Sequence, residues 1–337
     1  MDKFPRITII VPSYNQAEYL DETLSSIIDQ AYPNLELFVI DGGSTDTSVE
    51  VIERFSSAIT WWVSEKDQGQ SHAINKGLKR ATGDVINWIN SDDILAEGSL
   101  NKIAYIFESN PGLHCLIGGL EYFNHEKKWI PQTQQTFTTL TEAYGSFRIR
   151  QPSMFYSKKA VAYFGELNSE LHYCMDLDWW YKFIGHFGIE STLQISDTLA
   201  FFRIHHSSKS STAFQGFLKE KALLIYSIAL SQSFKHENRT LEILFNDIVN
   251  FSNAVSNFKY PEITSSAVRS AIFSLVIVRH SEIYTKAEFT RCVFALRVIR
   301  KSFPEFILDP EYIKLKKVLR FGWFWFRINR KLKSKFS

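Results

Sequence analysis

The sequence predicts an α/β fold: a mostly parallel sheet with helices on both faces, followed by an α-helical C-terminal extension. Strand-like and helix-like segments alternate from residue 7 to residue 107, which is the pattern of a doubly wound parallel sheet. The strand expected over 85–89 is apolar on both sides, as strands are when helices cover both faces. After residue 213 turn residues become sparse and helical stripes follow one another. We therefore expect two domains, over 1–213 and 214–337.

The first three strands are short apolar, β-branched runs, and a helical pattern follows each of them. These strands are expected over 7–11, 35–40 and 59–63. After the first strand, apolar residues recur with helical spacing from Leu20 to Ala31, and the helix stops before Pro33. Further helical stripes run over 49–55 and 73–78. The segment after the fourth strand shows another, from Leu100 to Phe107.

Beyond this helix the pattern becomes less regular. Residues 114–119 are expected to form another strand, and 121–131 either a hairpin or an insertion. In the C-terminal region we expect helices over 222–230, 241–255, 268–278 and 289–299.

Composition limits the class of protein. An apolar fraction of 45% over 337 residues is ample for a core and argues against disorder. The three cysteines have no close spacing, which fits a reducing compartment and buried thiols. We expect no secretory signal and no membrane span, because the apolar runs fall short of about 20 residues. The predicted location is cytoplasmic.

Acidic and polar residues follow three of the predicted strands. Residues 12–15 follow the first strand, Asp41 the second, and Asp92-Asp93 the fourth. In a doubly wound sheet these loops lie at one edge, where such sheets bind ligands. Adjacent carboxylates repel each other unless a cation or a proton neutralises them, so a divalent metal is expected at Asp92-Asp93. The alternative is an acidic helix N-cap.

Two nucleotide-binding signatures are missing. No Gly-x-Gly-x-x-Gly follows the first strand, and no Gly-x-x-x-x-Gly-Lys-Ser/Thr occurs in the chain. What remains is an acid that could reach a ribose or a base, and a carboxylate pair for a metal. Together these suit a nucleoside diphosphate whose charge the metal offsets.

Four ordered segments resemble the inverting family 2 glycosyltransferases, which have the GT-A fold, a Rossmann-like sheet with helices on both faces. They are IIVPSYNQAEYLDETLSSI, FVIDGGSTDTSVEVI, WWVSEKDQGQSHAINKGLKRATGDVI and NWINSDDILAEGSL, and the resemblance covers about residues 5–210. It implies that Asp41 binds the nucleobase, Asp92 the ribose side of the donor, and Asp93 a Mg²⁺ or Mn²⁺ ion at the pyrophosphate. One departure is Asn90, where the family often has a carboxylate.

The loop after the third strand borders the nucleotide in this family, which makes Asp67 and Gln70 candidates. The alternative for this loop is a surface turn with an N-capping acid. The segment 150–156 resembles one that lies on the acceptor side. The resemblance implies a nucleotide-sugar site made of Pro12, Ser13, Tyr14, Asn15, Asp41, Asp67, Gln70, Ser91, Asp92 and Arg203.

Asp176 and Asp178 form a second chemical centre at the start of an aromatic-rich helix. Residues two apart on a helix point in different directions, so we expect one acid at the site. By the resemblance Asp176 is the catalytic base, although Met175 stands where an acid often precedes it. Asp178 is expected to be a helix-start or solvated acid. The alternative is that both acids only favour the helix start.

Arg203 and His205 would share one side of an extended segment. The resemblance implies that Arg203 contacts the diphosphate and that His205 is a further metal ligand. The alternative is a polar edge strand with solvated histidines.

The last 24 residues carry nine Lys or Arg and no acid, interleaved with aromatic residues. Such composition is typical of an interfacial membrane segment, which predicts a peripheral enzyme on the cytoplasmic face of the membrane. The alternative is an aromatic helix packed on the protein's own core. Nucleic acid is not an expected partner, because the rest of the chain is net acidic.

We therefore expect a metal-dependent, inverting glycosyltransferase that moves a sugar from a UDP- or dTDP-linked donor to the hydroxyl of a saccharide or lipid-linked acceptor, in cell-surface polysaccharide or glycolipid assembly. A carboxylate such as Asp176 is needed because a hydroxyl has a very high pKa. The alternatives are a sugar nucleotidyltransferase, which lacks support because 11–16 has no glycine-rich basic loop, and a non-catalytic scaffold with the same fold.

Overall fold

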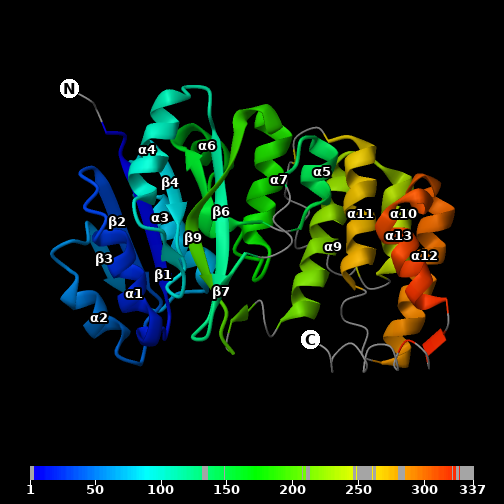
Figure 1. Ribbon diagram of the computed structural model, residues 1–337, viewed down its shortest axis with the longest axis horizontal. Helices are drawn as coiled ribbons and strands as arrows, with labels where there is room; N and C mark the ends of the chain where they lie inside the picture. The colour runs from blue at the N-terminus through cyan, green and yellow to red at the C-terminus, as the bar shows by residue number, and fades with distance from the viewer. Residues whose placement is uncertain are drawn as a thin grey trace. The chain divides into compact units, whose positions relative to one another are not determined.

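The computed structural model of the protein describes residues 4–130, 136–147, 149–206, 208–209, 213–245, 248, 260, 263–279, 285–320, 322–323 and 326. The chain folds into two compact units (Figure 1). The first comprises Met1–Thr138 and Arg148–Phe214, and the second Thr139–Phe147 and Gln215–Ser337. The second unit thus includes a short segment from within the sequence of the first.

The first unit is built on one mixed sheet with the strand order β3-β2-β1-β4-β8-β6-β9-β5. Strands β1 to β4 are parallel, β8 runs antiparallel to β4 and β6, and β6 and β9 are parallel. The strands are β1 (Ile7–Ser13), β2 (Leu35–Asp41), β3 (Trp61–Ser64), β4 (Val85–Trp88), β5 (Ile94–Leu95), β6 (Cys115–Phe123), β7 (Lys128–Trp129), β8 (Met154–Ser157) and β9 (Thr192–Arg203).

Helices cover both faces of this sheet, as predicted. Ile7, Ile9 and Val11 of β1 pack into a core with α1, α2 and α4. On the opposite face, α3 approaches β1 so closely that a Cβ on Gly77 would lie 2.6 Å from Ile10. The helices of this unit are α1 (Ala17–Ile28), α2 (Ser48–Arg54), α3 (Gln70–Leu78), α4 (Ser99–Ser109), α6 (Lys158–Phe164) and α7 (Met175–Phe187), with the short 3-10 helices η1 (Gln151–Ser153) and η2 (Ile189–Ser191).

Two features of the sheet go beyond the prediction. Strand β6 continues to Phe123 and pairs with β7, so the segment expected to be a hairpin or an insertion forms a hairpin. Strand β8 was not predicted, and it lies antiparallel between β4 and β6. The antiparallel β5 pairs with β9, so β9 is not an edge strand.

The order of the parallel strands defines a switch point. The chain winds outward from β1 through β2 to β3, and then returns to place β4 on the other side of β1. The loops after β1 and β4 therefore diverge at their carboxyl ends, which is where open α/β sheets form ligand-binding crevices.

The second unit is helical. Its elements are α5 (Leu140–Gly145), α9 (Phe214–Ser231), α10 (Lys235–Leu244), α11 (Ser265–Arg279), α12 (Lys286–Ser302), η5 (Pro304–Leu308) and α13 (Pro310–Leu319). Helix α10 begins before the predicted residue 241, and most of 246–259 lies outside the described residues. Within the described chain, no helix has the length and apolar character needed to cross a bilayer. All three cysteines are buried, as predicted.

Candidate active site

The turn after β2 is organised by the carboxylate of Asp41. Asp41 is fully buried and accepts hydrogen bonds from the backbone N–H groups of Gly43 (3.0 Å) and Ser44 (2.8 Å). The hydroxyls of Ser44 (2.5 Å) and Ser64 (2.7 Å) also donate to it. Both carboxylate oxygens are therefore satisfied within the protein, and a contact with a nucleobase would have to replace one of these hydrogen bonds.

Residues 12–15, predicted to line the nucleotide, join this turn. Ser13 is buried, and its hydroxyl has no hydrogen-bond partner among the described residues. Tyr14 is 59% exposed. The backbone N–H of Asn15 donates to Ser44 Oγ (2.8 Å), so the loops after β1 and β2 form one connected surface.

Asp67 lies against the same turn. Its Oδ1 accepts a hydrogen bond from the backbone N–H of Gly69 at 2.8 Å. A Cβ atom on Gly42 would lie 2.7 Å from Asp67 Oδ2, so the absence of a side chain at Gly42 lets the Asp67 carboxylate approach the turn. The structure thus places Asp67 against Gly42, the residue that follows Asp41 in the chain.

The two acids after β4 have opposite environments. Asp93 is fully buried; its Oδ1 accepts a hydrogen bond from the Arg203 backbone N–H (3.1 Å) and its Oδ2 one from Asn90 Nδ2 (3.1 Å). Burial, with the nearby charge of Asp92 adding to it, raises the pKa of Asp93 well above its usual range. Asp93 therefore holds β9 and Asn90 in place. Ser91 is also buried, and its carbonyl accepts a hydrogen bond from Thr23 (3.0 Å).

The side chain of Asp92 is 23% exposed. Its Oδ2 lies 3.0 Å from His205 Nε2, and its carbonyl accepts a hydrogen bond from Arg203 Nε (2.9 Å). Arg203 also reaches Glu22 (2.5 Å), and its guanidinium lies over the ring of Tyr19 at 4.9 Å. The predicted common side of Arg203 and His205 is therefore realised around Asp92.

A chain of hydrogen bonds leads from the protein surface to Asp93, and it includes a residue that the sequence reading missed. Lys209 Nζ donates to Gln70 Oε1 (3.0 Å), Gln70 Nε2 to Asn90 Oδ1 (2.7 Å), and Asn90 in turn to Asp93. Lys209 lies in the segment already linked to the diphosphate, four residues after His205. Its closeness in sequence to Arg203 and His205 is the only feature of the sequence that could have identified Lys209, because its partner Gln70 lies 139 residues away.

Asp176 occupies the first turn of α7, and the segment that precedes it is fixed to α3. Asn75 on α3 donates to the carbonyl of Leu167 (2.9 Å) and accepts from its N–H (2.7 Å). Within α7, Trp179 packs against Trp88 at the end of β4, with ring centroids 5.5 Å apart. The start of α7, and with it Asp176, is therefore held by contacts with α3 and β4. The other candidate residues are gathered around the loops that follow β1, β2 and β4.

Asp178 also belongs to the first turn of α7, as expected, but the prediction of a solvated acid is wrong. Its side chain is fully buried and forms an ion pair with Lys182 at 2.7 Å, one turn further along the helix. The helical pattern could not show this, because burial depends on the sheet beneath.

The segment 150–156 packs under the end of β4. Gln151 Nε2 donates to the Trp88 carbonyl (2.7 Å) and to Asn87 Oδ1 (3.1 Å). Arg150 is largely buried and donates to the Gly118 carbonyl (3.2 Å), and burial lowers its pKa. These residues support the end of β4 from within the core.

Among the described residues, no group of three or more His, Cys, Asp or Glu side chains converges as a metal site. Asp92 and His205 fit as two protein ligands, because a carboxylate oxygen and an imidazole nitrogen face each other there and Asp92 is accessible. Asp93 fits poorly, since both of its oxygens are already engaged and it has no exposed surface.

Residues 8–171 match the family model described as glycosyl transferase family 2. A Haemophilus influenzae protein described as an uncharacterized glycosyltransferase is 40% identical over 101 residues, which are 29% of this chain and 40% of that protein. A putative teichuronic acid biosynthesis glycosyltransferase of Bacillus subtilis, TuaG, is 33% identical over 101 residues, also 29% and 40% of the two chains. A longer match, to an uncharacterized glycosyltransferase of Rickettsia typhi, is 24% identical and spans 65% of this chain and 70% of the relative.

Solved structures show the same fold. S. aureus TarS 1–349 in complex with UDP has a TM-score of 0.56 at 17% identity, over 94% of this chain and 92% of that one. The mannosyltransferase PcManGT from Pyrobaculum calidifontis, in complex with GDP-Man and Mn²⁺, has a TM-score of 0.54 at 16% identity, over 95% and 85%. The predicted fold class, an α/β GT-A fold followed by a helical C-terminal region, is confirmed.

Proposed function

Residues 8–171 belong to glycosyl transferase family 2, and from this membership we propose that the protein transfers a sugar from a nucleoside-diphosphate sugar to an acceptor hydroxyl, with inversion at the anomeric carbon. The observation that carries the proposal is the position of Asp92 with Arg203 and His205 at the switch point between β1 and β4. A donor diphosphate placed there would meet cationic side chains, while its nucleoside would extend over the loops after β1 and β2.

The nucleoside half of the site is formed by residues 12–15 with Asp41 and Asp67. We assign the contacts with base and ribose to the exposed Tyr14 and to the turn that Asp41 orders, with a UDP- or dTDP-linked donor as the expected substrate. The buried hydroxyl of Ser13 is available for a further hydrogen bond, because no described residue satisfies it.

The diphosphate half is formed by Arg203, Lys209 and the pair Asp92–His205. We assign the metal-ligand role to Asp92 and His205 rather than to Asp93, whose oxygens hold Asn90 and Arg203. A Mg²⁺ or Mn²⁺ ion bound by this pair would offset the charge of the departing nucleoside diphosphate. Arg203 is held in position by its bond to the Asp92 carbonyl and by Glu22.

Asp176 is the proposed general base. An inverting displacement needs a carboxylate on the acceptor side to accept the hydroxyl proton as the oxygen attacks the anomeric carbon. Asp176 is half-buried in the first turn of α7, whereas Asp178 is fully buried and forms an ion pair with Lys182. Asp176 is therefore suited to proton transfer and Asp178 to stabilising the helix. The acceptor we expect is the hydroxyl of a saccharide or of a lipid-linked saccharide in cell-surface polymer or glycolipid assembly.

A panel of nucleoside diphosphates and their sugars, with and without Mg²⁺ or Mn²⁺, tests the donor. Binding to the native state raises the unfolding midpoint by mass action, so the matching nucleotide should raise Tm in a concentration-dependent way. Release of nucleoside diphosphate in the presence of acceptor oligosaccharides then reports turnover. If no nucleotide sugar shifts Tm and none is turned over, the proposal is wrong.

Asp176→Asn and Asp178→Asn form a matched pair for the base. Asp176→Asn should lower kcat by at least about 100-fold, since a general base contributes 10²–10⁴-fold, while leaving Tm and donor affinity close to wild type. Asp178→Asn should instead lower stability by about 3–5 kcal/mol, because it removes the buried negative charge that pairs with Lys182. Near-normal turnover by a folded Asp176→Asn variant would remove Asp176 from the mechanism.

A further inference from the structure

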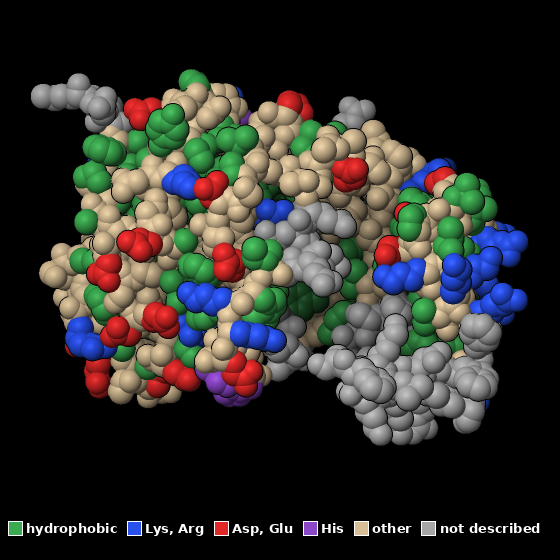
Figure 2. Space-filling model, in the orientation of Figure 1, with side chains coloured by type: hydrophobic (Ala, Val, Ile, Leu, Met, Phe, Trp, Pro, Cys, Tyr) green, Lys and Arg blue, Asp and Glu red, His purple; other side chains and the backbone are tan. Residues whose placement is uncertain are grey.

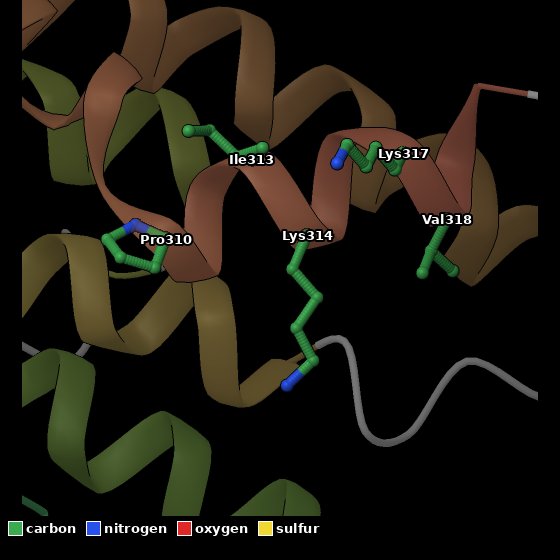
Figure 3. A pocket seen from close by; sticks show the side chains of 5 residues that line it. All are labelled: Pro310, Ile313, Lys314, Lys317 and Val318. Atoms are coloured by element: carbon green, nitrogen blue, oxygen red, sulfur yellow. The ribbon is translucent and has the colours of Figure 1, made fainter.

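The outward face of α13 and the turn before it combine exposed apolar side chains with lysines. Leu308, at the end of η5, is 80% exposed, and Ile307 beside it is also exposed. Figure 3 shows five side chains of α13 that line a single shallow hollow. We name the whole patch the α13 surface; its residues are Ile307, Leu308, Pro310, Ile313, Lys314, Lys317 and Val318.

The α13 surface is not the core-facing side of its helix. Tyr312, Leu315 and Leu319 recur at helical spacing and are buried, so they supply the contact of α13 with the rest of its unit. Ile313 and Val318 lie outside this stripe and remain exposed. Exposed apolar side chains that cluster with charged ones mark an interaction site more often than scattered ones do.

The charge of this region is strongly positive. Lys314 pairs with Glu311 at 3.3 Å, and Asp309 caps the helix. Within the described part of the chain, no carboxylate pairs with Lys316, Lys317 or Arg320. Figure 2 shows Lys and Arg side chains gathered where Figure 1 places α12 and α13. On α12 itself, the side chains of Arg297, Arg300 and Lys301 are exposed. The sequence after residue 320 adds five basic residues and no acid.

We propose that the α13 surface docks on an anionic lipid bilayer. The lysines would lie at the level of the lipid phosphates, and Leu308 with its apolar neighbours would enter the boundary between headgroups and acyl chains. Charge complementarity selects an anionic partner, and the apolar side chains select lipid over nucleic acid, whose backbone contacts are made by polar and basic groups. The surface lies in the helical unit, so this inference goes beyond the proposed transfer reaction and is independent of the catalytic residues.

Flotation of the full-length protein with phosphatidylcholine vesicles, with and without phosphatidylglycerol, tests the proposal. Wild type should float only with the anionic vesicles. Lys314→Gln combined with Lys317→Gln should weaken the vesicle affinity about 25-fold, since each basic residue near such a surface contributes about fivefold. Leu308→Ser should weaken it about tenfold through lost apolar burial. Two matched controls change exposed positions of the first unit and should float like wild type. They are Tyr105→Ser on α4, and Lys79→Gln combined with Lys102→Gln.

The outcomes separate the alternatives. Unchanged flotation of both α13 variants would overturn the proposal, whether binding is absent or carried by another segment such as the extreme C-terminus. Loss in the lysine variant with full retention in Leu308→Ser, together with equal binding to a polyanion such as heparin, would also overturn it in favour of a polyanion site. Donor-induced shifts in Tm should stay at the wild-type value in every variant, so failure of membrane docking and failure of the proposed reaction can be told apart.

Discussion

Asp92 and Asp93 show how far two identical neighbours can differ. Asp93 has no exposed surface and binds the Arg203 backbone and the Asn90 side chain, whereas Asp92 is accessible and faces His205. A carboxylate that already holds two protein groups contributes mainly to architecture, whereas an accessible carboxylate that faces an imidazole can replace this contact by a bond to a metal ion.

Asn substitutions at these two positions should therefore have different effects. Asp92→Asn should leave Tm nearly unchanged. It should raise the metal concentration needed for half-maximal activity by at least about tenfold, because loss of a residue that merely hydrogen-bonds a metal ligand already costs about that much. Asp93→Asn should lower the free energy of unfolding by about 1–3 kcal/mol, because an amide cannot accept both hydrogen bonds. Metal titrations of activity, read beside denaturant unfolding, measure both. If instead Asp93→Asn raised the metal requirement and Asp92→Asn lowered only stability, Asp93 would be the metal ligand.

Lys209 offers a residue-scale test of the diphosphate position. Lys209→Met should weaken the binding of a nucleoside diphosphate about 10- to 100-fold, the loss expected for one charge-assisted hydrogen bond, and leave the affinity for the uncharged nucleoside unchanged. Calorimetric titration with both ligands gives the two affinities. Lys79→Met, at the opposite end of α3, is the matched control. Equal losses for nucleoside and nucleoside diphosphate would place Lys209 away from the phosphates.

The sequence located the acidic loops but not the state of each acid. Asp41, Asp92 and Asp176 could be identified because acids at strand ends and helix starts stand out against apolar runs. Which acid is buried depends on groups that arrive from far along the chain, such as the backbone N–H of Arg203, which binds Asp93 from 110 residues away. No local pattern contains that information.

At the scale of elements, Glu36 joins three parts of the sheet end opposite the candidate site. Its carboxylate accepts hydrogen bonds from Thr8 on β1 (2.5 Å) and from the N–H and hydroxyl of Thr82 (2.8 and 2.7 Å) before β4. Burial alone would raise the pKa of Glu36, but the hydrogen bonds from Thr8 and Thr82 and the charge of Arg6 outweigh burial and lower it.

A lowered pKa predicts the sign of a pH effect. The contribution of ionised Glu36 is fully present above the pKa of the unfolded chain, about 4.3, and is lost as the pH falls through the lower folded-state value. Glu36→Gln should therefore be less stable than wild type at neutral pH by about 1–3 kcal/mol, and this difference should shrink in acid. Urea unfolding of both proteins at pH 7 and at pH 3 measures it. A difference that is constant with pH would contradict the assignment.

The parallel half of the sheet was predictable because each of its strands is followed by a helical stripe. Strand β8 was not, since Met154–Ser157 follows a short 3-10 turn and its pairing is set by contacts with β4 and β6 that span more than 35 residues. The Gln151 side chain fixes that turn beneath β4. Pairings of this kind are tertiary, so local propensity does not reveal them.

At the scale of the whole molecule, each of the two compact units is formed by two separate stretches of the sequence. The helical C-terminal region was predictable from its stripes, but the assignment of α5 to that unit was not, because α5 lies in the sequence between β7 and β8. Its partner α11 begins 120 residues after the end of α5. The predicted domain boundary between residues 213 and 214 remains a prediction. The compact units add one further exchange between them, because the chain enters the second unit at Thr139 and returns to the first at Arg148.

That exchange has a consequence for dissecting the protein. The backbone passes from one unit to the other at residues 138–139, 147–148 and 214–215. A fragment ending at residue 213 would retain α5 but lose α11, against which Gly145 packs so closely that a Cβ would lie 2.5 Å from Ser270. Ala143 and Tyr144 of α5, which are buried in the full chain, would lose the cover of the second unit. The first unit expressed alone would therefore carry an exposed apolar helix, which favours aggregation.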